Sequence, residues 1–110
     1  MTSDVRVTAA VAKVLAAFLE DPAAHRYGLD LMRATDQPSG TLYPILSRLR
    51  DAGWVAAEWE PEHDPAVEGR PARRYSQLTP HGVTAARTAV AELYQSLARA
   101  QRVSGKPRPA

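Results

Sequence analysis

The side chains best suited to polar recognition lie on one side of a predicted helix at residues 39–52. Apolar residues Leu42, Ile45, Leu46 and Leu49 recur at intervals of three and four, which predicts one buried stripe. The opposite face consists of small residues, hydroxyls and one guanidinium. Such a face lets a helix backbone approach a major groove and hydrogen-bond phosphates or base edges, although an ordinary solvated helix is the alternative. The outward and flanking residues are Gly40, Thr41, Tyr43, Pro44, Ser47 and Arg48.

Residue combinations suited to catalysis or metal binding are scarce. The sequence has no cysteine, which removes disulfides, thiolate metal sites and thiol nucleophiles. His25, His63 and His81 lie in three different loop or cap contexts, and residues 62–64 are consecutive rather than spaced to converge on a metal. There is no serine-nucleophile motif and no phosphate-binding glycine loop. We therefore expect a protein that is not an enzyme and that uses no metal and no cofactor.

Charge is distributed unevenly along the chain. Fourteen Lys and Arg against twelve Asp and Glu give a net charge of only +2, so nucleic-acid binding must depend on where the charges lie. Five acids and no Lys or Arg occupy residues 58–68, and Arg70, Arg73 and Arg74 follow at once. Because the acidic stretch repels phosphates, only the arginine side of this region can attract DNA.

Around the polar helix the sequence predicts further helices. A first helix at about residues 8–19 belongs to the core or to an interface, and a short second helix ends near Thr35. Residues 36–38 are of types that favour turns and helix caps, and they lead directly into the helix at 39–52. Gly53 is expected to end that helix. Two helices joined by about three residues, the second with a polar outer face, form a helix-turn-helix.

Two strands are predicted next, at residues 54–59 and 73–78, with a loop rich in Pro and Gly between them. Since two strands cannot stand alone in water, this hairpin must pack on the helices. Trp54 and Trp59 lie an odd number of positions apart, so they should face opposite sides of the strand, and at least one should be partly exposed. The expected fold class is mainly α with a small β-hairpin, a winged helix-turn-helix.

The last predicted helix begins at Thr79 and Pro80 and ends near residue 101. Its apolar residues alternate steps of three and four, and a helix roughly 30 Å long exceeds what a small winged domain can cover. We therefore expect a homodimer. The chain then divides into a winged helix-turn-helix at 1–78, a dimerisation helix at 79–102 and a disordered tail at 103–110. The seam residues are Val83, Ala86, Val90, Leu93, Leu97 and Ala100.

These motifs together resemble the PadR family of bacterial transcriptional regulators. The resemblance covers about residues 14–97, and its blocks occur in the right order and spacing. One departure is that Ser76 follows Tyr75, where family members commonly have two tyrosines, which puts the local packing of the wing in doubt. The matching blocks are Tyr27-Gly28-Leu29-Asp30-Leu31, Ser39-Gly40-Thr41-Leu42-Tyr43-Pro44, Gly53-Trp54, Gly69-Arg70-Pro71, Arg74-Tyr75 and Leu78-Thr79 with Gly82.

The resemblance implies a dimeric repressor of the small subfamily, which has no separate effector domain, bound to a pseudo-palindromic operator and often released by a small effector. It implies that Ser39, Thr41, Tyr43 and Pro44 face the major groove and backbone, while Arg70 and Arg73 follow the adjacent minor groove. Tyr43 would contact a phosphate, or it would cover the junction between two helices. Dimerisation through the first and last helices would involve Val11, Val14, Phe18, Val83, Val90, Leu93 and Leu97.

An effector site is the weaker part of this hypothesis. Tyr94 lies beside Leu93 and Leu97 on the last helix and could line a cavity between protomers together with Val11 and Phe18, where a planar apolar or phenolic compound would bind. Packing without a ligand is the default. A winged-helix module that binds a protein partner or a small molecule and reads no DNA is the alternative function, because the acidic loop could meet a basic partner. No apolar run is long enough to span a membrane, so we expect a cytoplasmic protein, and the resemblance implies a bacterial one.

Overall fold

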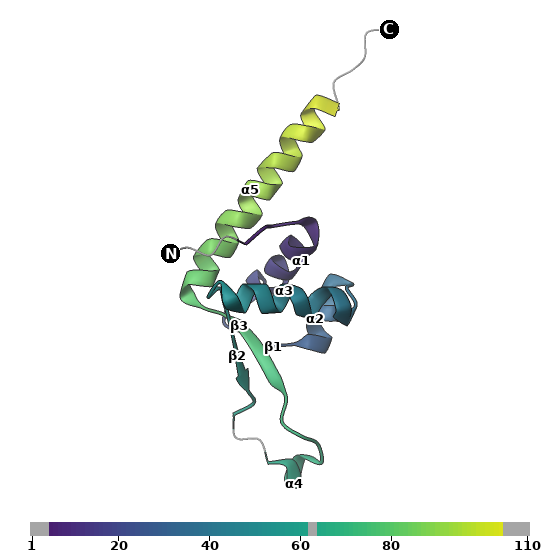
Figure 1. Cartoon of the computed structure of the whole chain (residues 1–110), viewed down its shortest axis with the longest axis vertical. Helices are drawn as coiled ribbons and strands as arrows, with labels where there is room; N and C mark the ends of the chain where they lie inside the picture. Colours follow the sequence, from purple (N-terminus) through teal and green to yellow (C-terminus); the bar gives the residue numbers. More distant parts are fainter. Residues whose placement is uncertain (1–4, 62–63, 105–110) are drawn as a thin grey trace.

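The computed structural model describes residues 5–61 and 64–104, which form a helical body with a narrow sheet below it and one long helix rising above it (Figure 1). The predicted fold class, a winged helix-turn-helix with a long C-terminal helix, is confirmed. In chain order the elements are α1 (Ala9–Leu19), β1 (Arg26–Tyr27), α2 (Gly28–Thr35), α3 (Ser39–Asp51), β2 (Val55–Trp59), α4 (Pro65–Glu68), β3 (Arg74–Leu78) and α5 (Pro80–Ser104).

Local capping chemistry sets the helix-turn-helix. Asp36 ends α2 in the left-handed region, at φ 53°, and turns the chain toward α3. The side-chain amide of Gln37 donates a 3.0 Å hydrogen bond to the Ala10 carbonyl, which ties this turn to α1. At the other end of α3, Gly53 at φ 76° donates to the Arg50 carbonyl, and the next amide, that of Trp54, donates back to Leu49. This is the Schellman arrangement, and it confirms the predicted role of Gly53.

The sheet has three strands rather than the two predicted, in the order β1-β3-β2, with both pairings antiparallel. β1 was missed because two residues immediately before a helix carry no alternating pattern. The prediction that at least one of the two tryptophans is partly exposed is confirmed. Trp54 is 8% exposed and belongs to the core, whereas Trp59 is 61% exposed on the wing.

The loop between β2 and β3 contains a one-turn helix, α4, which was also missed. Asp64 caps it by accepting a 3.0 Å hydrogen bond from the Ala66 amide, Pro65 occupies its first position, and Gly69 ends it in the left-handed region. Asp-Pro followed by Gly at this spacing is a start-and-stop signal that the sequence did offer. Residues 62 and 63 lie outside the described residues, and the predicted loop position of His63 lies there too.

The long helix α5 belongs to the body in its first half and projects from it in its second half (Figure 1). Ala86 is fully buried in the common core, and Val83 and Val90 pack against that core. Beyond them Leu93 is half-buried, and Leu97 is 59% exposed. The helix includes residues 103 and 104, which the sequence assigned to a disordered tail; the rest of that predicted tail lies outside the described residues.

The α1 residues of the predicted dimer interface are buried within the single chain. Val11, Val14 and Phe18 are 2%, 0% and 1% exposed within the single chain, where they form the centre of the core. The cause is that α1 packs against the first half of α5 and against α2 and α3, so its apolar stripe is already covered. These three side chains offer no surface to a second copy.

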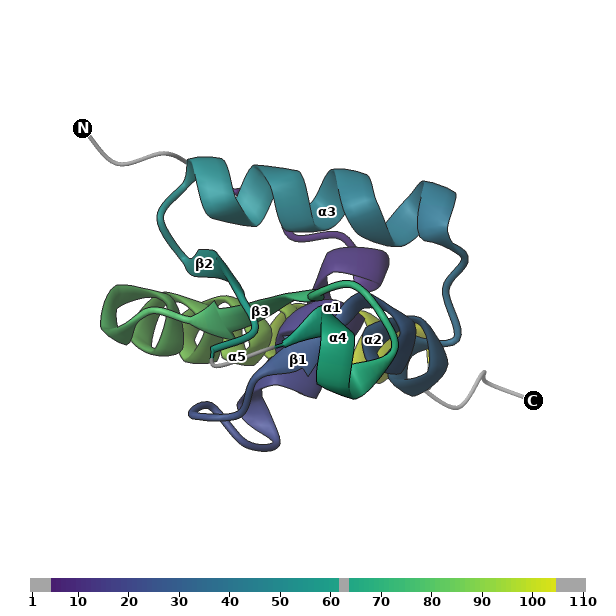
Figure 2. The same ribbon diagram turned by 90° about the horizontal axis from the view of Figure 1, so that it is seen from below.

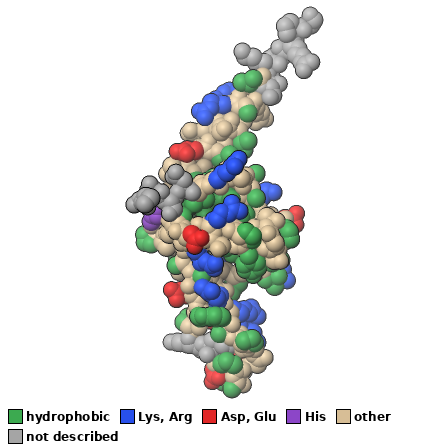
Figure 3. All heavy atoms as spheres, in the orientation of Figure 1, with side chains coloured by type: hydrophobic (Ala, Val, Ile, Leu, Met, Phe, Trp, Pro, Cys, Tyr) green, Lys and Arg blue, Asp and Glu red, His purple; other side chains and the backbone are tan. Residues whose placement is uncertain are grey.

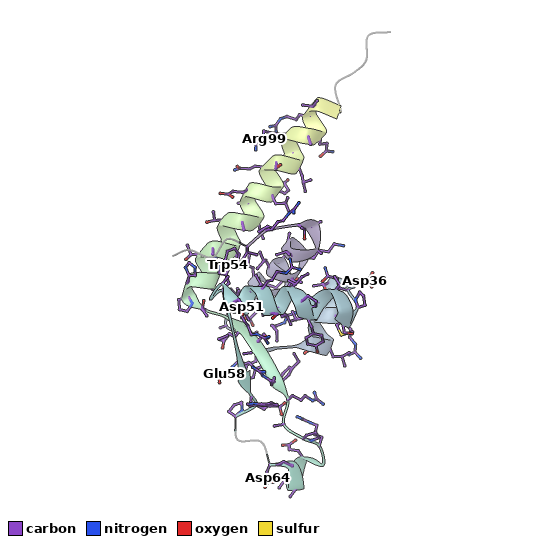
Figure 4. All side chains as sticks on the ribbon, viewed as in Figure 1. Asp36, Asp51, Trp54, Glu58, Asp64 and Arg99 are labelled. Atoms are coloured by element: carbon purple, nitrogen blue, oxygen red, sulfur yellow. The ribbon has the colours of Figure 1, made fainter. Side chains whose placement is uncertain are left out.

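The start of α5 is docked so tightly that it yields a stability prediction. Thr79 caps the helix by accepting a 2.9 Å hydrogen bond from the Gly82 amide, and its own amide donates to the Trp54 carbonyl at 3.0 Å. A Cβ added at Gly82 would collide with that same carbonyl, which is backbone and cannot swing aside. Figure 4 labels Trp54 at this junction, where the end of α3 meets α5.

We expect Gly82→Ala to lower the free energy of unfolding by about 1–3 kcal/mol, the usual cost of overpacking. Urea denaturation measures it. Gly40→Ala is the matched control, because no atom lies within 4 Å of the added Cβ at that helical position and alanine is the better helix former. A Gly82→Ala variant as stable as the wild type would show that the α5 junction tolerates displacement.

Candidate nucleic-acid interface

Figure 2 shows α3 along one edge of the molecule, with its outer side not covered by another element. The predicted apolar stripe holds this helix to the body, since Leu42, Ile45, Leu46 and Leu49 are all buried. Of the predicted groove-facing residues, Ser47 is half-buried and the others are exposed: Ser39, Thr41, Tyr43, Pro44 and Arg48. The structure therefore brings these side chains together on one accessible face.

Tyr43 does two things at this face. Its ring lies over the start of α2, where a Cβ at Gly28 would collide with the tyrosine hydroxyl, and so it covers the junction between the two helices. The side chain is nevertheless 52% exposed. The junction-covering alternative is thus present in the structure, and contact with a phosphate stays a prediction.

Pro38 is the N-cap residue of α3, and its side chain provides no capping hydrogen bond. The Thr41 and Leu42 amides are bonded to the Pro38 carbonyl, both at 3.0 Å, and the first helical amides precede them. Backbone N–H groups at a helix start, together with the positive end of the helix dipole, favour an anion such as a phosphate. This end of α3 is therefore electrostatically suited to nucleic acid.

A groove of about 650 Å³ separates α3 from the wing. Two exposed arginines, Arg73 and Arg74, lie on its wing side, and Arg50 lies on its α3 side. Asp30 is the one acidic residue among the described residues of the lining. The remaining lining residues are Tyr27, Gly28, Leu29, Tyr43, Leu46, Ala57 and Ser76.

Three cross-strand pairs explain why this groove exists. Opposite residues in an antiparallel pair share a face, so Val55 with Leu78, Ala57 with Ser76, and Trp59 with Arg74 point to the same side of the sheet. The first of these pairs is buried in the core. The second consists of two small residues, and the third places an aromatic ring beside a guanidinium.

The small middle pair leaves space between α3 and the large outer pair. Ser76 is the residue that departs from the two-tyrosine pattern, and it is 7% exposed at the floor of the groove. A tyrosine at this position would project into the space that Ser76 leaves. The departure therefore opens the groove and leaves the pairing of β2 with β3 regular along its whole length.

Arg70, predicted to follow the minor groove, is held by a carboxylate instead. Its two terminal nitrogens donate to Glu60 at 2.9 and 3.1 Å, and a Glu60 oxygen also accepts from the Arg73 amide at 3.2 Å. These bonds, led by that from Arg70, hold the pKa of Glu60 at about 2, well below its ordinary value of 4.5. A hydrogen bond from Tyr27 acts in the same direction. Glu60, which follows β2, is thus linked to Arg70 and Arg73 before β3 and to Tyr27 in β1.

Comparison with protein families shows which family this chain belongs to. The sequence model of the "Transcriptional regulator PadR-like family" matches residues 17–88, which is more than half of the chain. The chain belongs to this family. The match includes the helix-turn-helix, the whole wing and the start of α5, so the resemblance read from the sequence motifs is confirmed.

Solved structures share the PadR-like fold over most of the chain. A protein of Streptococcus mutans UA159 is 25% identical with a TM-score of 0.67, and the alignment covers 98% of this chain and 100% of the other. A PadR-like transcription factor from Bacteroides fragilis is 21% identical, with a TM-score of 0.59 and coverage of 86% and 85%. Reduced AbfR bound to DNA is 21% identical, with a TM-score of 0.56 and coverage of 92% and 75%. No curated protein gave a significant match.

Basic and acidic side chains of the PadR-like wing lie in different places. Figure 3 shows Lys and Arg side chains gathered in a column on the face that carries α3, continuing onto the strands of the wing. Glu58 lies opposite Tyr75 in the sheet and so points away from the face of Trp59 and Arg74. Figure 4 shows Glu58 at the outer edge of β2 and Asp64 at the wing tip. Glu58 and Asp64 therefore lie away from the arginine side of the groove, whereas Glu60 is bonded to Arg70 and to the Arg73 amide.

Four residues outside the predicted DNA-binding set bear on the groove: Arg50, Tyr27 and Arg74 line it, and Trp59 lies opposite Arg74 in the sheet. Arg50 lies outside the apolar stripe of α3, is exposed and lines the groove. Arg74 belongs to the arginine side of the wing that was expected to attract DNA, whereas no motif indicated a site role for Tyr27 or Trp59. Their roles depend on β1 pairing with β3 and on the register between β2 and β3, neither of which the sequence specifies.

Protonation of Glu60 gives a prediction for the PadR-like wing. Because the folded-state pKa is lowered, the stability contributed by this carboxylate is complete above its ordinary pKa of 4.5 and is lost as the pH falls from 4.5 toward 2. We expect Glu60→Gln to be less stable than the wild type at neutral pH and the difference to shrink over that window. Urea denaturation at several pH values checks this; a difference independent of pH would exclude the ionised carboxylate as its source.

The described residues contain neither a candidate metal site nor a candidate membrane-spanning helix. Over residues 5–61 and 64–104, no group of three His, Cys, Asp or Glu could hold a metal ion. Within the same ranges, no helix has the length and hydropathy needed to cross a membrane. His25 stacks on Tyr75 with ring centroids 3.8 Å apart, which places it on the sheet as a packing residue.

Proposed function

We propose that this PadR-like protein is a sequence-specific DNA-binding repressor that acts as a homodimer, each protomer placing α3 in the major groove of one half-site. The observation that carries the proposal is the open polar face of α3 beside a groove with three arginines in its lining. Family membership supports DNA as the partner, and AbfR, which shares the fold, was solved bound to DNA. The proposed place of action is the bacterial cytoplasm, where the DNA lies.

Residue roles follow from the geometry of the face. Ser39, Thr41, Pro44, Ser47 and Arg48 would lie against the major groove, where hydroxyls and a guanidinium bond base edges and phosphates and the proline adds apolar contact. The exposed part of Tyr43 would meet the backbone. The groove beside α3 would hold one sugar–phosphate strand, with Arg50 on one side and Arg73 on the other. In this proposal Arg70 supports the wing through Glu60 and does not read DNA.

The dimer would form through the projecting half of α5. Leu93, Tyr94 and Leu97 lie there, and Tyr94 and Leu97 are 73% and 59% exposed in the single chain. A second copy would bury these apolar side chains and set the spacing of the two α3 helices, which fixes the distance between half-sites.

A planar aromatic effector remains part of the proposal, with fewer residues lining its site than the sequence suggested. Val11 and Phe18 are buried in the core and cannot line a cavity between protomers, which leaves Leu93, Tyr94 and Leu97 as its lining. Such a compound releases the repressor only if it binds the DNA-free and DNA-bound states with different affinity. An equal affinity for phenolic compounds with and without DNA would exclude this control.

The experiment that tests the function is selection from a library of random DNA duplexes. We expect enrichment of a site with two-fold symmetry, whose binding weakens steeply as salt rises because several phosphates are neutralised. Light scattering of the selected complex should give two protomers per duplex. Recovery of no sequence over background would contradict sequence-specific reading, and a stable complex of one protomer would contradict the dimer.

A further inference from the structure

Trp59 is a large apolar side chain in a position where the fold does not need one. It ends β2 on the narrow wing, beyond the body, and 61% of it is exposed. The other tryptophan, Trp54, is 8% exposed and belongs to the core. Burial therefore accounts for Trp54 and leaves Trp59 without a packing role of comparable size.

The contact that Trp59 does make is with a cation. The guanidinium carbon of Arg74 lies 5.6 Å from the centre of the indole ring, within the range of a cation–π interaction. The two residues are directly opposite each other in the register of β2 and β3. They share the sheet face on which Ala57 and Ser76 form the floor of the groove, and Arg74 itself lines that groove.

Two neighbouring arginines on the wing are thus held in chemically different ways. Arg70 donates both terminal nitrogens to Glu60, so its donors and its charge are already engaged. An aromatic face attracts a guanidinium through its quadrupole without accepting the N–H groups at the edge of the cation. Arg74 is therefore oriented while its charge and its in-plane donors stay available to an anion.

We propose that Trp59 is a positioning residue for DNA binding: its indole ring holds the Arg74 guanidinium at the groove beside α3, where the guanidinium bonds a phosphate of the DNA backbone. This inference rests on the proposed function. An exposed arginine on a wing would otherwise sample many rotamers, and ordering a long side chain opposes binding. The ring would reduce that cost before DNA arrives.

The test measures binding of a short random-sequence DNA duplex, as fluorescence anisotropy over a range of salt concentrations, because phosphate contacts need no specific site. We expect Trp59→Leu, which keeps an apolar side chain but removes the ring, to weaken binding about two- to fivefold per protomer. Trp59→Phe should retain much of the affinity. Arg74→Gln should weaken binding and lower the slope of log K against log salt by about 0.9 per protomer.

The decisive comparison is the double variant. If Trp59 acts through Arg74, adding Trp59→Leu to Arg74→Gln should cause no further loss, whereas an independent role would make the two losses add. Val67→Ala is the control for an exposed apolar residue on the wing, since Val67 is 79% exposed on α4. Unfolding midpoints should not change in any of these variants.

Three results would overturn the inference alone, and a fourth would overturn it together with the proposed function. Wild-type affinity in Trp59→Leu, or additive losses in the double variant, would show that the ring does not position Arg74 for DNA. Equal loss in Trp59→Phe and Trp59→Leu would exclude the aromatic face as the cause. Failure of the wild-type protein to bind the duplex even at low salt would instead overturn the proposed function, and the inference with it.

Discussion

Arg73→Gln should weaken binding of duplex DNA about tenfold for each protomer near 0.1 M salt and lower the slope of log K against log salt by about 0.9. Arg73 is exposed and lines the groove beside α3, so its charge faces the space in which the DNA backbone is proposed to lie. Each phosphate neutralised by a cation releases bound counterions, and losing one such contact removes a fixed part of the salt dependence. Anisotropy titrations over a range of salt concentrations measure both quantities.

The matched variant for this prediction removes the neighbouring ion pair as a unit. Glu60→Gln combined with Arg70→Gln deletes one negative and one positive charge, so the net charge of the wing is unchanged. Because Arg70 is engaged with Glu60, we expect the salt slope of the double variant to equal that of the wild type. A slope lowered as much as in Arg73→Gln would show that Arg70 exchanges Glu60 for a phosphate on binding.

Leu97→Asp should convert the proposed dimer to a monomer and reduce operator affinity by about 10²–10⁴. Leu97 is 59% exposed in the projecting half of α5, so an aspartate there does not disturb the core, but a desolvated carboxylate opposes burial against a second copy. Binding two half-sites with one linked pair of protomers gives a gain of this size over separate binding. Light scattering gives the oligomeric state, and anisotropy gives the affinity.

Gln95→Asp is the control for that variant. Gln95 is exposed on the same half of α5, two positions from Leu97 and thus on the opposite side of the helix. The same charge at this position should leave the dimer and its DNA affinity unchanged. If both variants dissociate the dimer, charge on α5 rather than the apolar side of the helix would be the cause; if neither does, the interface lies elsewhere.

Periodicity and capping chemistry made most of the fold predictable. The stripe of Leu42, Ile45, Leu46 and Leu49 specifies both the buried side of α3 and, by exclusion, its polar face. Gly53 and Thr79 act through local hydrogen bonds, so their roles could be read from neighbouring residues alone. The parts of the interface on α3 were predicted for the same reason.

The parts of the site on the wing depend on contacts between residues distant in the sequence. Nothing near Arg70 specifies that Glu60, ten positions earlier, accepts both of its terminal nitrogens. The pairing of Trp59 with Arg74 requires the strand register, which the loop between them does not determine. Similarly, the spacing of apolar residues on α1 is the same whether the helix faces a core or a second protomer, and only the packing of α5 against it decides the question for Phe18.

The most direct test of the central claim, that α3 reads the major groove, is methylation interference on the duplex selected by the protein. Methylation at guanine N7 blocks the major groove, whereas methylation at adenine N3 blocks the minor groove. We predict that guanine N7 methylation abolishes binding at two symmetric clusters about one helical turn apart. Interference confined to adenine N3, or an absence of interference at either groove, would contradict the placement of α3 in the major groove.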